Sequence, residues 1–153
     1  MSAGSIIVLA FLAFVAITIF KGVRIVPQGY KWIVQRLGKY HTTLGPGLNF
    51  VIPYIDEVAY KVTTKDIVLD IPSQEVISRD NAVLLMNAVA YINLTTPEKA
   101  VYGIENYTWA IQNMVQTSLR SIVGEMDLDD ALSSRDHIKA KLKAAISDDI
   151  ADW

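Results

Sequence analysis

The longest apolar run in the chain covers residues 4–20 and contains no charged side chain. As a helix rising 1.5 Å per residue, it would extend about 26 Å, close to the thickness of a bilayer's hydrocarbon core. A helix also satisfies its backbone hydrogen bonds internally, which lipid requires. The run therefore predicts an N-terminal transmembrane anchor over residues 1–22. Its lipid-facing side chains are expected to include Ile6, Leu9, Phe11, Phe14, Ile17 and Phe20.

A cleaved signal peptide is the main alternative to a retained anchor. Such a peptide carries basic residues before its apolar run and a small-residue cleavage site after it. Residues 1–3 include no basic side chain, and the sequence Lys-Gly-Val-Arg at 21–24 does not resemble a cleavage site. A retained, single-pass anchor is favoured. Since Lys21 and Arg24 are its flanking positive charges, the positive-inside rule places the following domain in the cytoplasm.

Short alternating or apolar segments separated by turn residues predict antiparallel strands in the first half of the chain. The expected strands cover residues 30–37, 48–52, 58–63, 66–71, 74–78 and 82–94, after a short apolar stretch at 23–26. Gly45-Pro46-Gly47 predicts a turn, and His41 is expected in the loop before it. Pro72 is expected to end a strand, and residues 79–81 to form a hairpin turn.

Helical spacing replaces alternation after residue 95. Thr96 and Pro97 predict a helix start, with Thr96 as the cap, and this short helix is expected to end near Gly103. Asn106 is expected to cap a second helix that ends with Gly124 as its C-terminal cap. A third helix is expected to begin near residue 127 or 129, with the apolar stripe Ala131, Ile138, Leu142, Ala145, Ile146 and Ile150. Strands followed by helices predict an α+β domain over residues 23–153.

Composition narrows the function classes. The 153 residues carry a net charge of -2, which gives no reason to expect nucleic acid as a partner. The chain has no cysteine, which excludes disulfides, thiolate catalysis and cysteine-ligated zinc.

The charge is unevenly distributed along the chain. Residues 21–65 hold seven basic and two acidic side chains, a net +5, whereas residues 66–153 hold seven basic and fourteen acidic ones, a net -7. A basic segment directly after an anchor suits a surface lying on anionic lipid headgroups. An ordinary solvated face explains the same charges equally well.

The segment 44–54 is apolar, rich in turn residues and close in sequence to the anchor. We expect it to lie at the membrane interface. The interface candidates are Lys21, Arg24, Phe50, Ile52, Pro53 and Tyr54. The alternative is a core strand that enters a turn, and for Phe50 this alternative is slightly favoured.

Candidate chemistry is sparse, and no catalytic, metal or cofactor site is expected. The histidines are His41 and His137. A Ser-His-Asp set drawn from Ser133 or Ser134 with His137 and Asp136 has poor geometry, because neighbouring helical residues point about 100° apart. The acidic residues 127, 129 and 130 lack the spacing of a calcium loop, so helix capping explains them better.

Several motifs in order resemble the stomatin/prohibitin/flotillin family, whose shared unit is the SPFH or band 7 domain. They are residues 25–30 (IVPQGY), 36–40 (RLGKY), 44–48 (LGPGL), 69–81 (LDIPSQEVISRDN), 117–124 (TSLRSIVG) and 128–136 (LDDALSSRD). The resemblance covers nearly the whole chain and implies a curved antiparallel sheet packed with helices. In the family a further strand and a coiled coil follow the tryptophan that Trp153 resembles, and this sequence does not include them.

The resemblance also implies a function. Members of the family assemble side by side into rings or cages, organise lipid microdomains and hold or regulate membrane proteases. We therefore expect a non-enzymatic homo-oligomeric scaffold in a bacterial inner membrane, with lipids and a membrane-bound protease or other membrane protein as partners. The oligomer-contact candidates lie on the polar side of the last helix: Arg135, Lys139 and Lys143. The alternatives are an accessory subunit without large self-assembly and, less favoured, a membrane hydrolase.

Overall fold

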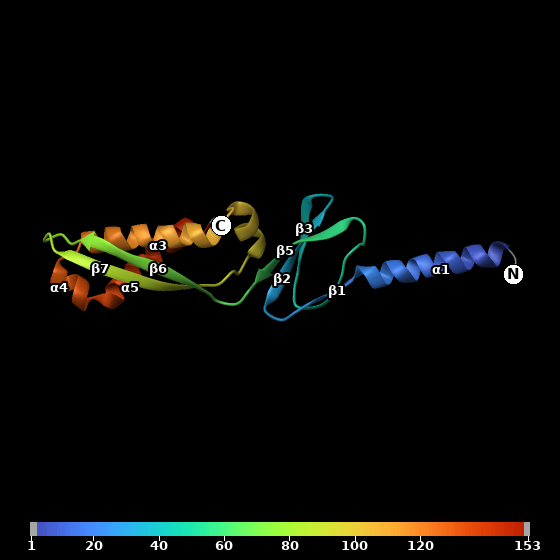
Figure 1. Cartoon of the computed structure of the whole chain (residues 1–153), viewed down its shortest axis with the longest axis horizontal. Helices are drawn as coiled ribbons and strands as arrows, with labels where there is room; N and C mark the ends of the chain where they lie inside the picture. Colours follow the sequence, from blue (N-terminus) through green and yellow to red (C-terminus); the bar gives the residue numbers. More distant parts are fainter. Residues whose placement is uncertain (1–2, 152–153) are drawn as a thin grey trace. The chain divides into compact units, whose positions relative to one another are not determined.

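The computed structural model describes residues 3–151 (Figure 1). The chain divides into two compact units, residues 1–65 and 66–153. The division falls where the net charge changes from +5 to -7. Residues 1, 2, 152 and 153 lie outside the described residues, and the limits 1–22 and 23–153 remain predictions.

The first unit begins with the predicted helix, α1 (Ala3–Gly22), which leads directly into β1 (Val23–Val26). β1 pairs antiparallel with β4 (Gly47–Phe50) in a two-stranded sheet. The end of α1 is fixed to this sheet, because the Val51 amide donates to the Gly22 carbonyl at 2.8 Å. The pairing thus joins segments that lie more than twenty residues apart in sequence.

A second antiparallel sheet places β2 (Tyr30–Arg36) between β3 (Lys39–Leu44) and β5 (Asp56–Thr63). His41 was expected in a loop, but it lies within β3. The connection between β2 and β3 is Leu37-Gly38, with φ of 51° and 82°. Positive φ at both central residues matches the twist of a tight hairpin, but leucine in the first position gives no sequence signal for it.

The core of the first unit forms between these sheets from Val26, Val34, Leu44 and Val51, with Trp32 and Val58 packed against it. The side chains of β2 were expected to alternate between a buried and an exposed face, yet the neighbours Ile33 and Val34 are both fully buried. The pairing of β2 with β5 shifts register between these two residues. Such an irregularity allows neighbouring side chains to be buried on both sides of the strand.

An ion pair joins the ends of β2 and β5. The Arg36 Nε and Nη2 atoms donate to the two Asp56 oxygens at 2.7 and 3.1 Å, and the Ile52 amide donates to the same carboxylate. The Asp56 side chain is only 3% exposed. The hydrogen bond from Arg36 is the main cause that lowers the pKa of Asp56 to about 2, from an ordinary 3.8.

Asp56→Asn is expected to destabilise the first unit by about 2 kcal/mol at neutral pH, because it removes a charged hydrogen-bond acceptor. Since folding lowers this pKa, the stabilisation is present above pH 4 and is lost as the pH falls toward 2. Hydrogen exchange of β2 and β5 amides at pH 5 and pH 2.5 measures both effects. Glu57→Gln, the same change at an exposed site of β5, is the control. Equal exchange rates in the two variants would contradict the prediction.

The second unit is built on one long hairpin, β6 (Ile67–Ile77) and β7 (Val83–Ile92). Pro72 was expected to end a strand at this point, and that expectation is wrong. Ile71 pairs with Ala88 and Gln74 with Met86, so two residues of β6 lie opposite one of β7. Pro72 needs no ladder partner in this bulge. The extra residue also brings Ile71, Gln74 and Val76 to the same buried face.

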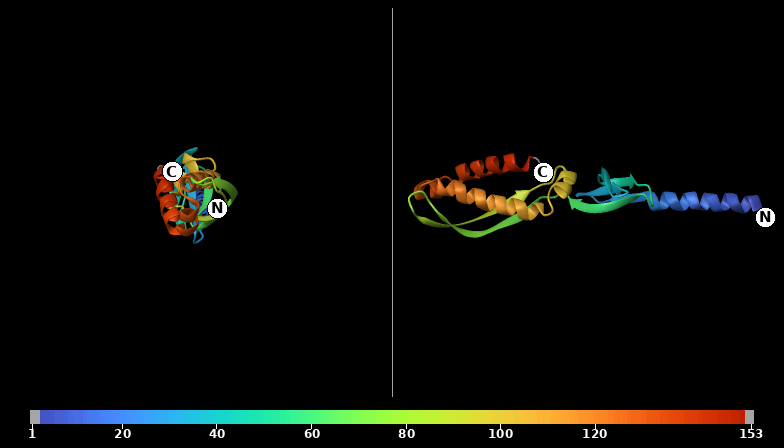
Figure 2. Two further views of the ribbon diagram at one scale, coloured as in Figure 1. Left: turned by 90° about the vertical axis from the view of Figure 1, so that its left-hand side faces the viewer. Right: turned by 90° about the horizontal axis from the view of Figure 1, so that it is seen from above.

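Four helices follow the hairpin: α2 (Pro97–Gly103), α3 (Tyr107–Gly124), α4 (Leu128–Ser133) and α5 (Arg135–Ile150). α3 and α5 lie side by side, and both pack on the β6–β7 sheet (Figure 2). α3 buries Ile111, Val115, Leu119 and Val123, which recur every four residues. Of the apolar stripe expected on the last helix, Ile138 is the residue that α5 buries. The buried core residues are Leu69, Ile71, Val76, Ile111, Val115, Leu119, Val123, Ala131 and Ile138.

A buried polar contact attaches α3 to the bulge. The Gln74 amide donates to the Gln116 carbonyl at 2.9 Å, and its oxygen accepts from Arg120 at 3.0 Å. Both polar atoms of the side chain are therefore satisfied. Since Gln74 is only 7% exposed, these bonds compensate for the cost of removing it from water.

The helix ends differ from expectation in three places. Thr96 precedes α2 but makes no side-chain cap, whereas Asn106 caps α3 through the Trp109 amide as expected. Gly124 does not adopt a left-handed cap, because the Glu125 amide bonds the Ile122 carbonyl and tightens the last turn instead. The expected third helix is divided at Ser134 into α4 and α5, and Ala145 is exposed.

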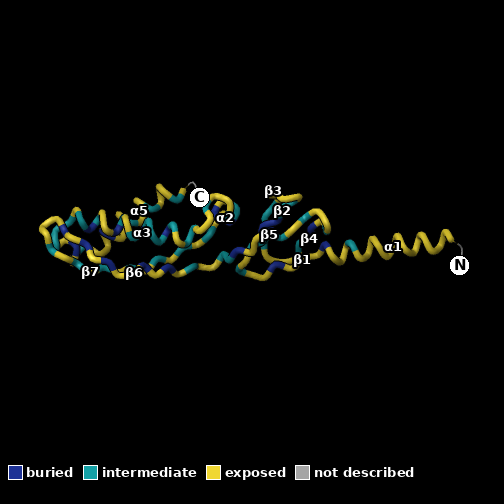
Figure 3. The backbone as a smooth tube through the Cα atoms, turned by 45° about the horizontal axis from the view of Figure 1, so that its top comes forward, coloured by how far each residue is buried: buried dark blue, intermediate teal, exposed yellow. Residues whose placement is uncertain are grey.

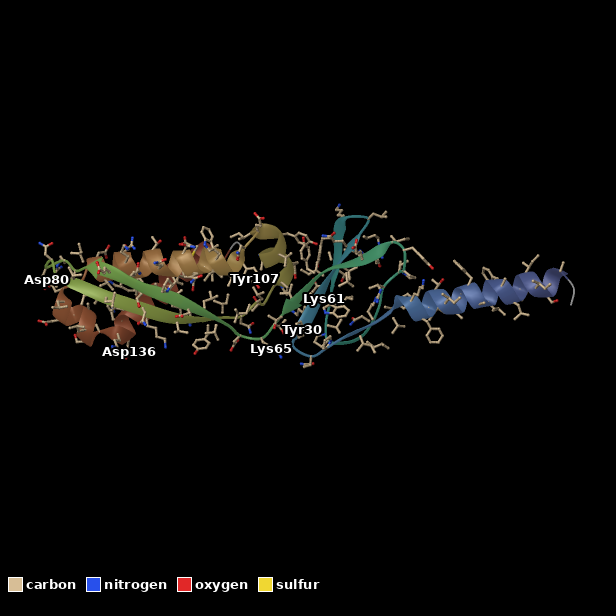
Figure 4. The ribbon with its side chains drawn as sticks, in the orientation of Figure 1. Tyr30, Lys61, Lys65, Asp80, Tyr107 and Asp136 are labelled. Atoms are coloured by element: carbon tan, nitrogen blue, oxygen red, sulfur yellow. The ribbon has the colours of Figure 1, made fainter. Side chains whose placement is uncertain are left out.

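The hairpin tip supplies the cap that Asp127 was expected to provide. Asp80, labelled in Figure 4, accepts a hydrogen bond from the Leu128 amide at the start of α4. Asp127 instead pairs with Arg79, whose Nε lies 3.0 Å from its Oδ1. The hydrogen bond from the Ser78 hydroxyl is the main cause that lowers the pKa of Asp80. These contacts fix the hairpin tip to the helices.

Candidate membrane interface

Nearly all residues of α1 are exposed, as the yellow tube of this helix shows (Figure 3). Its exposed residues include large apolar side chains along the length of the helix. All six anchor candidates are more than half exposed. Its 20 residues reach about 30 Å, and its length and composition suffice to cross a membrane. Water would penalise so much apolar surface, whereas lipid would not. The charged residue within α1 is Lys21, at its C-terminal end.

The sheet that follows α1 continues this apolar surface. Val23 lies opposite Phe50 and Ile25 opposite Leu48, so these four side chains share one face of the β1–β4 pair. All four are exposed. The other face carries Val26, which is buried in the core. We call Val23, Ile25, Leu48 and Phe50 the apolar strand face.

Phe50 is therefore not a core residue. A core position was slightly favoured for it from the sequence, and that prediction was wrong. Its side chain is 58% exposed, and it lies against the end of α1. A Cβ atom built on Gly22 would lie 2.6 Å from the Phe50 ring and 2.7 Å from the Val51 carbonyl oxygen. Glycine at position 22 thus permits the close approach of helix and strand.

A hollow of about 400 Å³ lies beside the end of α1. Its lining combines two cations with aromatic and aliphatic side chains. The residues are Phe20, Lys21, Val23, Arg24, Val51, Pro53, Tyr54 and Asp56. The Lys21 ammonium lies 5.8 Å from the centre of the Tyr54 ring, within the range of a cation–π contact.

Tyr54 occupies an unusual backbone conformation. Its φ is 74°, in the left-handed region that side chains other than glycine rarely adopt. This conformation costs about 1–3 kcal/mol, and it turns the chain after Pro53. The ring is nevertheless exposed, so burial of the tyrosine does not explain the strained turn.

The structure thus brings five of the six predicted interface residues into the hollow or the apolar strand face, while Ile52 lies exposed in the adjoining loop. Sequence reasoning missed Val23, Ile25 and Leu48. Their alternate spacing was a weak signal, but the pairing of β1 with β4 was needed to place them on one face.

A second exposed apolar surface lies in the second unit, on the side of the β6–β7 sheet opposite the buried face. We call it the outer sheet face. It is formed by Val68, Ile77, Val83, Leu85, Val89 and Tyr91. Val68 pairs with Tyr91, and Ile77 with Val83. Within residues 3–151, β6 and β7 pair only with each other, so both edges of this sheet are open.

The predicted oligomer contacts lie on α5. Lys139 and Lys143 line a cavity of about 670 Å³, whose walls include Ile111 and Leu142. Arg135 begins the helix and is exposed. A role for these three cations in assembly remains a prediction.

The residues considered for catalysis are spread over several elements. His41 lies within β3, and His137 lies within α5. His137 directly follows Asp136, which is labelled in Figure 4. The Ser133 hydroxyl donates to the Asp129 carbonyl. Across residues 3–151, no three acidic or histidine side chains are grouped as metal ligands.

Comparison with known proteins identifies the family. Residues 24–153 match the model of the SPFH domain / Band 7 family. Human mitochondrial stomatin-like protein 2 is 36% identical over 128 residues, which cover 84% of this chain and 36% of that protein. An uncharacterized protein of Mycobacterium tuberculosis is 34% identical over 151 residues, which cover 99% of this chain and 40% of that protein.

An uncharacterized protein of Methanocaldococcus jannaschii is 41% identical over 135 residues, covering 88% of this chain and 67% of that protein. The chain spans about two fifths of the length of the mycobacterial relative. The family match extends over both units, and it confirms the resemblance seen in the sequence motifs. This chain belongs to the SPFH domain / Band 7 family.

Proposed function

We propose that this protein is a membrane-anchored scaffold rather than an enzyme. Many copies assemble on the membrane into a ring or cage, enclose a patch of lipid and hold a membrane-bound protease or another membrane protein there. The assembly supports quality control of membrane proteins. Family membership and the similarity to a stomatin-like protein support a role in membrane organisation.

The anchor and the charge distribution support attachment to a membrane. α1 is long and apolar enough to span it, and the unit that carries α1 has the net +5 charge. We place the chain in a bacterial inner membrane with residues 23–153 in the cytoplasm, since Lys21 and Arg24 follow the span.

The observation that carries the assembly proposal is the outer sheet face. Soluble monomers rarely expose so many neighbouring large apolar side chains, and such surfaces mark protein contacts. The open edges of the same sheet can pair with another chain. A second copy of this chain would cover both features. Each Leu or Val buried in that contact would contribute about 1.5–3 kcal/mol.

Leu85→Lys combined with Val89→Lys is expected to convert the large particle into small species. The contact would have to remove the two added charges from water, and this desolvation opposes assembly even beside acidic neighbours. The hairpin itself should tolerate the lysines, because Glu75 lies opposite Leu85 and Asp70 opposite Val89. Light scattering and electron microscopy of the detergent-extracted protein measure the particle.

Leu132→Lys is the matched control, since Leu132 is an exposed leucine on α4 outside the sheet. It should leave particle size unchanged. A double variant that keeps the full particle size would refute the outer sheet face as the contact. A wild-type protein that is only a monomer or dimer would refute the scaffold and favour an accessory subunit with one stoichiometric partner.

A further inference from the structure

We propose that the hollow beside the end of α1 binds the phosphate group of one anionic phospholipid. This inference rests on the membrane-anchor part of the proposed function and names the ligand that the interface recognises. It concerns a defined site for a single headgroup, in addition to the general attraction of a basic surface.

The position of the hollow matches the depth of lipid phosphates. α1 reaches about 30 Å, the thickness of a bilayer's hydrocarbon core, so its C-terminal end lies at the headgroup layer when the helix spans. Lys21 and Arg24 therefore enter the layer that contains the phosphates. Tyr54 beside them is of the residue type that concentrates at this depth.

The charges around the hollow favour an anion. Lys21 and Arg24 supply two positive charges, and the Arg24 guanidinium forms no ion pair within residues 3–151. The one acidic lining residue, Asp56, is already neutralised by its two bonds from Arg36. The Gly22 carbonyl at the negative end of α1 accepts a bond from Val51 and is also occupied.

The remaining walls suit the rest of a lipid. Phe20, Val23 and Pro53 give the hollow an apolar side, which fits the glycerol and the first acyl carbons. The apolar strand face continues this surface beyond the hollow. A small soluble phosphate would use the cations but leave these walls exposed to water.

The strained turn at Tyr54 points to the same site. A left-handed tyrosine costs free energy that the fold does not recover by burying the ring. Strained residues concentrate at functional sites, where the strain positions a side chain. Here the turn brings the tyrosine ring within cation–π range of Lys21 and so holds this lysine beside the hollow.

The test measures lipid selection by the whole chain reconstituted in phosphatidylcholine vesicles. Spin-labelled phosphatidylglycerol and phosphatidylcholine report which lipid is enriched at the protein surface. The wild type should enrich phosphatidylglycerol. Lys21→Gln and Arg24→Gln should each weaken the enrichment by about tenfold, because each removes a charge-assisted hydrogen bond to the phosphate. Lys39→Gln is the control, since Lys39 is exposed on β3 and does not line the hollow.

Loss of enrichment in the first two variants, with the control unchanged, supports the site. An equal loss in all three variants would indicate general surface attraction and would overturn the proposed site. Unchanged enrichment in Lys21→Gln and Arg24→Gln would also overturn it. Displacement of the lipid by excess glycerol phosphate would overturn the lipid assignment in favour of a soluble phosphate ester. Particle size, measured on the same samples, separates this proposal from the scaffold: lipid selection by a protein that does not assemble would refute only the scaffold.

Discussion

Replacing both Leu9 and Phe14 with arginine is expected to release the protein from membranes. Each position lies within α1 and is more than half exposed. An arginine near the middle of a spanning helix costs about 3 kcal/mol, and the pair costs about 6 kcal/mol. The protein remaining in the membrane pellet after an alkaline wash measures the effect.

The matched control is Leu132→Arg, which makes the same change at an exposed leucine outside α1. It should leave the protein in the pellet. The intact mass of the wild type, measured alongside, reports whether residues 1–22 are retained. A double variant that stays in the washed pellet would contradict the role of α1 as the anchor.

Ile71→Ala is expected to destabilise the second unit by about 2–5 kcal/mol. Ile71 is fully buried beside Leu69, Ile111 and Val115, so truncation leaves a cavity between β6 and α3. The midpoint of urea unfolding, followed by the helical circular dichroism of the detergent-solubilised protein, measures the loss.

Ile77→Ala is the control on the same strand. Ile77 is 60% exposed on the outer sheet face, so its truncation should change the unfolding midpoint much less. The two changes should differ in a second way as well. Ile77→Ala is expected to weaken assembly, whereas Ile71→Ala acts on the fold of each copy. If the two variants unfold at the same urea midpoint, the structure's assignment of Ile71 to the core and of Ile77 to the surface would be contradicted.

The proposed mechanism depends on geometry and number. One anchor attaches one copy, but copies joined through the outer sheet face attach through many anchors at once. Each further anchor then binds at a high effective concentration, which makes the assembly resident on the membrane. A headgroup site on every copy would also collect anionic lipid beneath the assembly. Lipid organisation would follow from these two contacts without a catalytic group.

The sequence alone determined the elements that depend on local periodicity. The apolar run predicts α1 because a spanning helix needs only length and composition. The spacing of apolar residues after Asn106 predicts α3 and its cap, which depend on neighbours within one or two turns. The hairpin at residues 79–81 was also predictable, since its turn residues act locally.

Only the tertiary structure decided which surfaces those elements present. The pairing of β1 with β4 creates the apolar strand face, and the bulge at Pro72 decides which residues of β6 face the helices. A shift of one residue in a strand exchanges its two faces, so register determines both core and contact surface. Register depends on partners distant in sequence, and local pattern does not specify it. The hollow that holds Lys21, Arg24 and Tyr54 arises for the same reason.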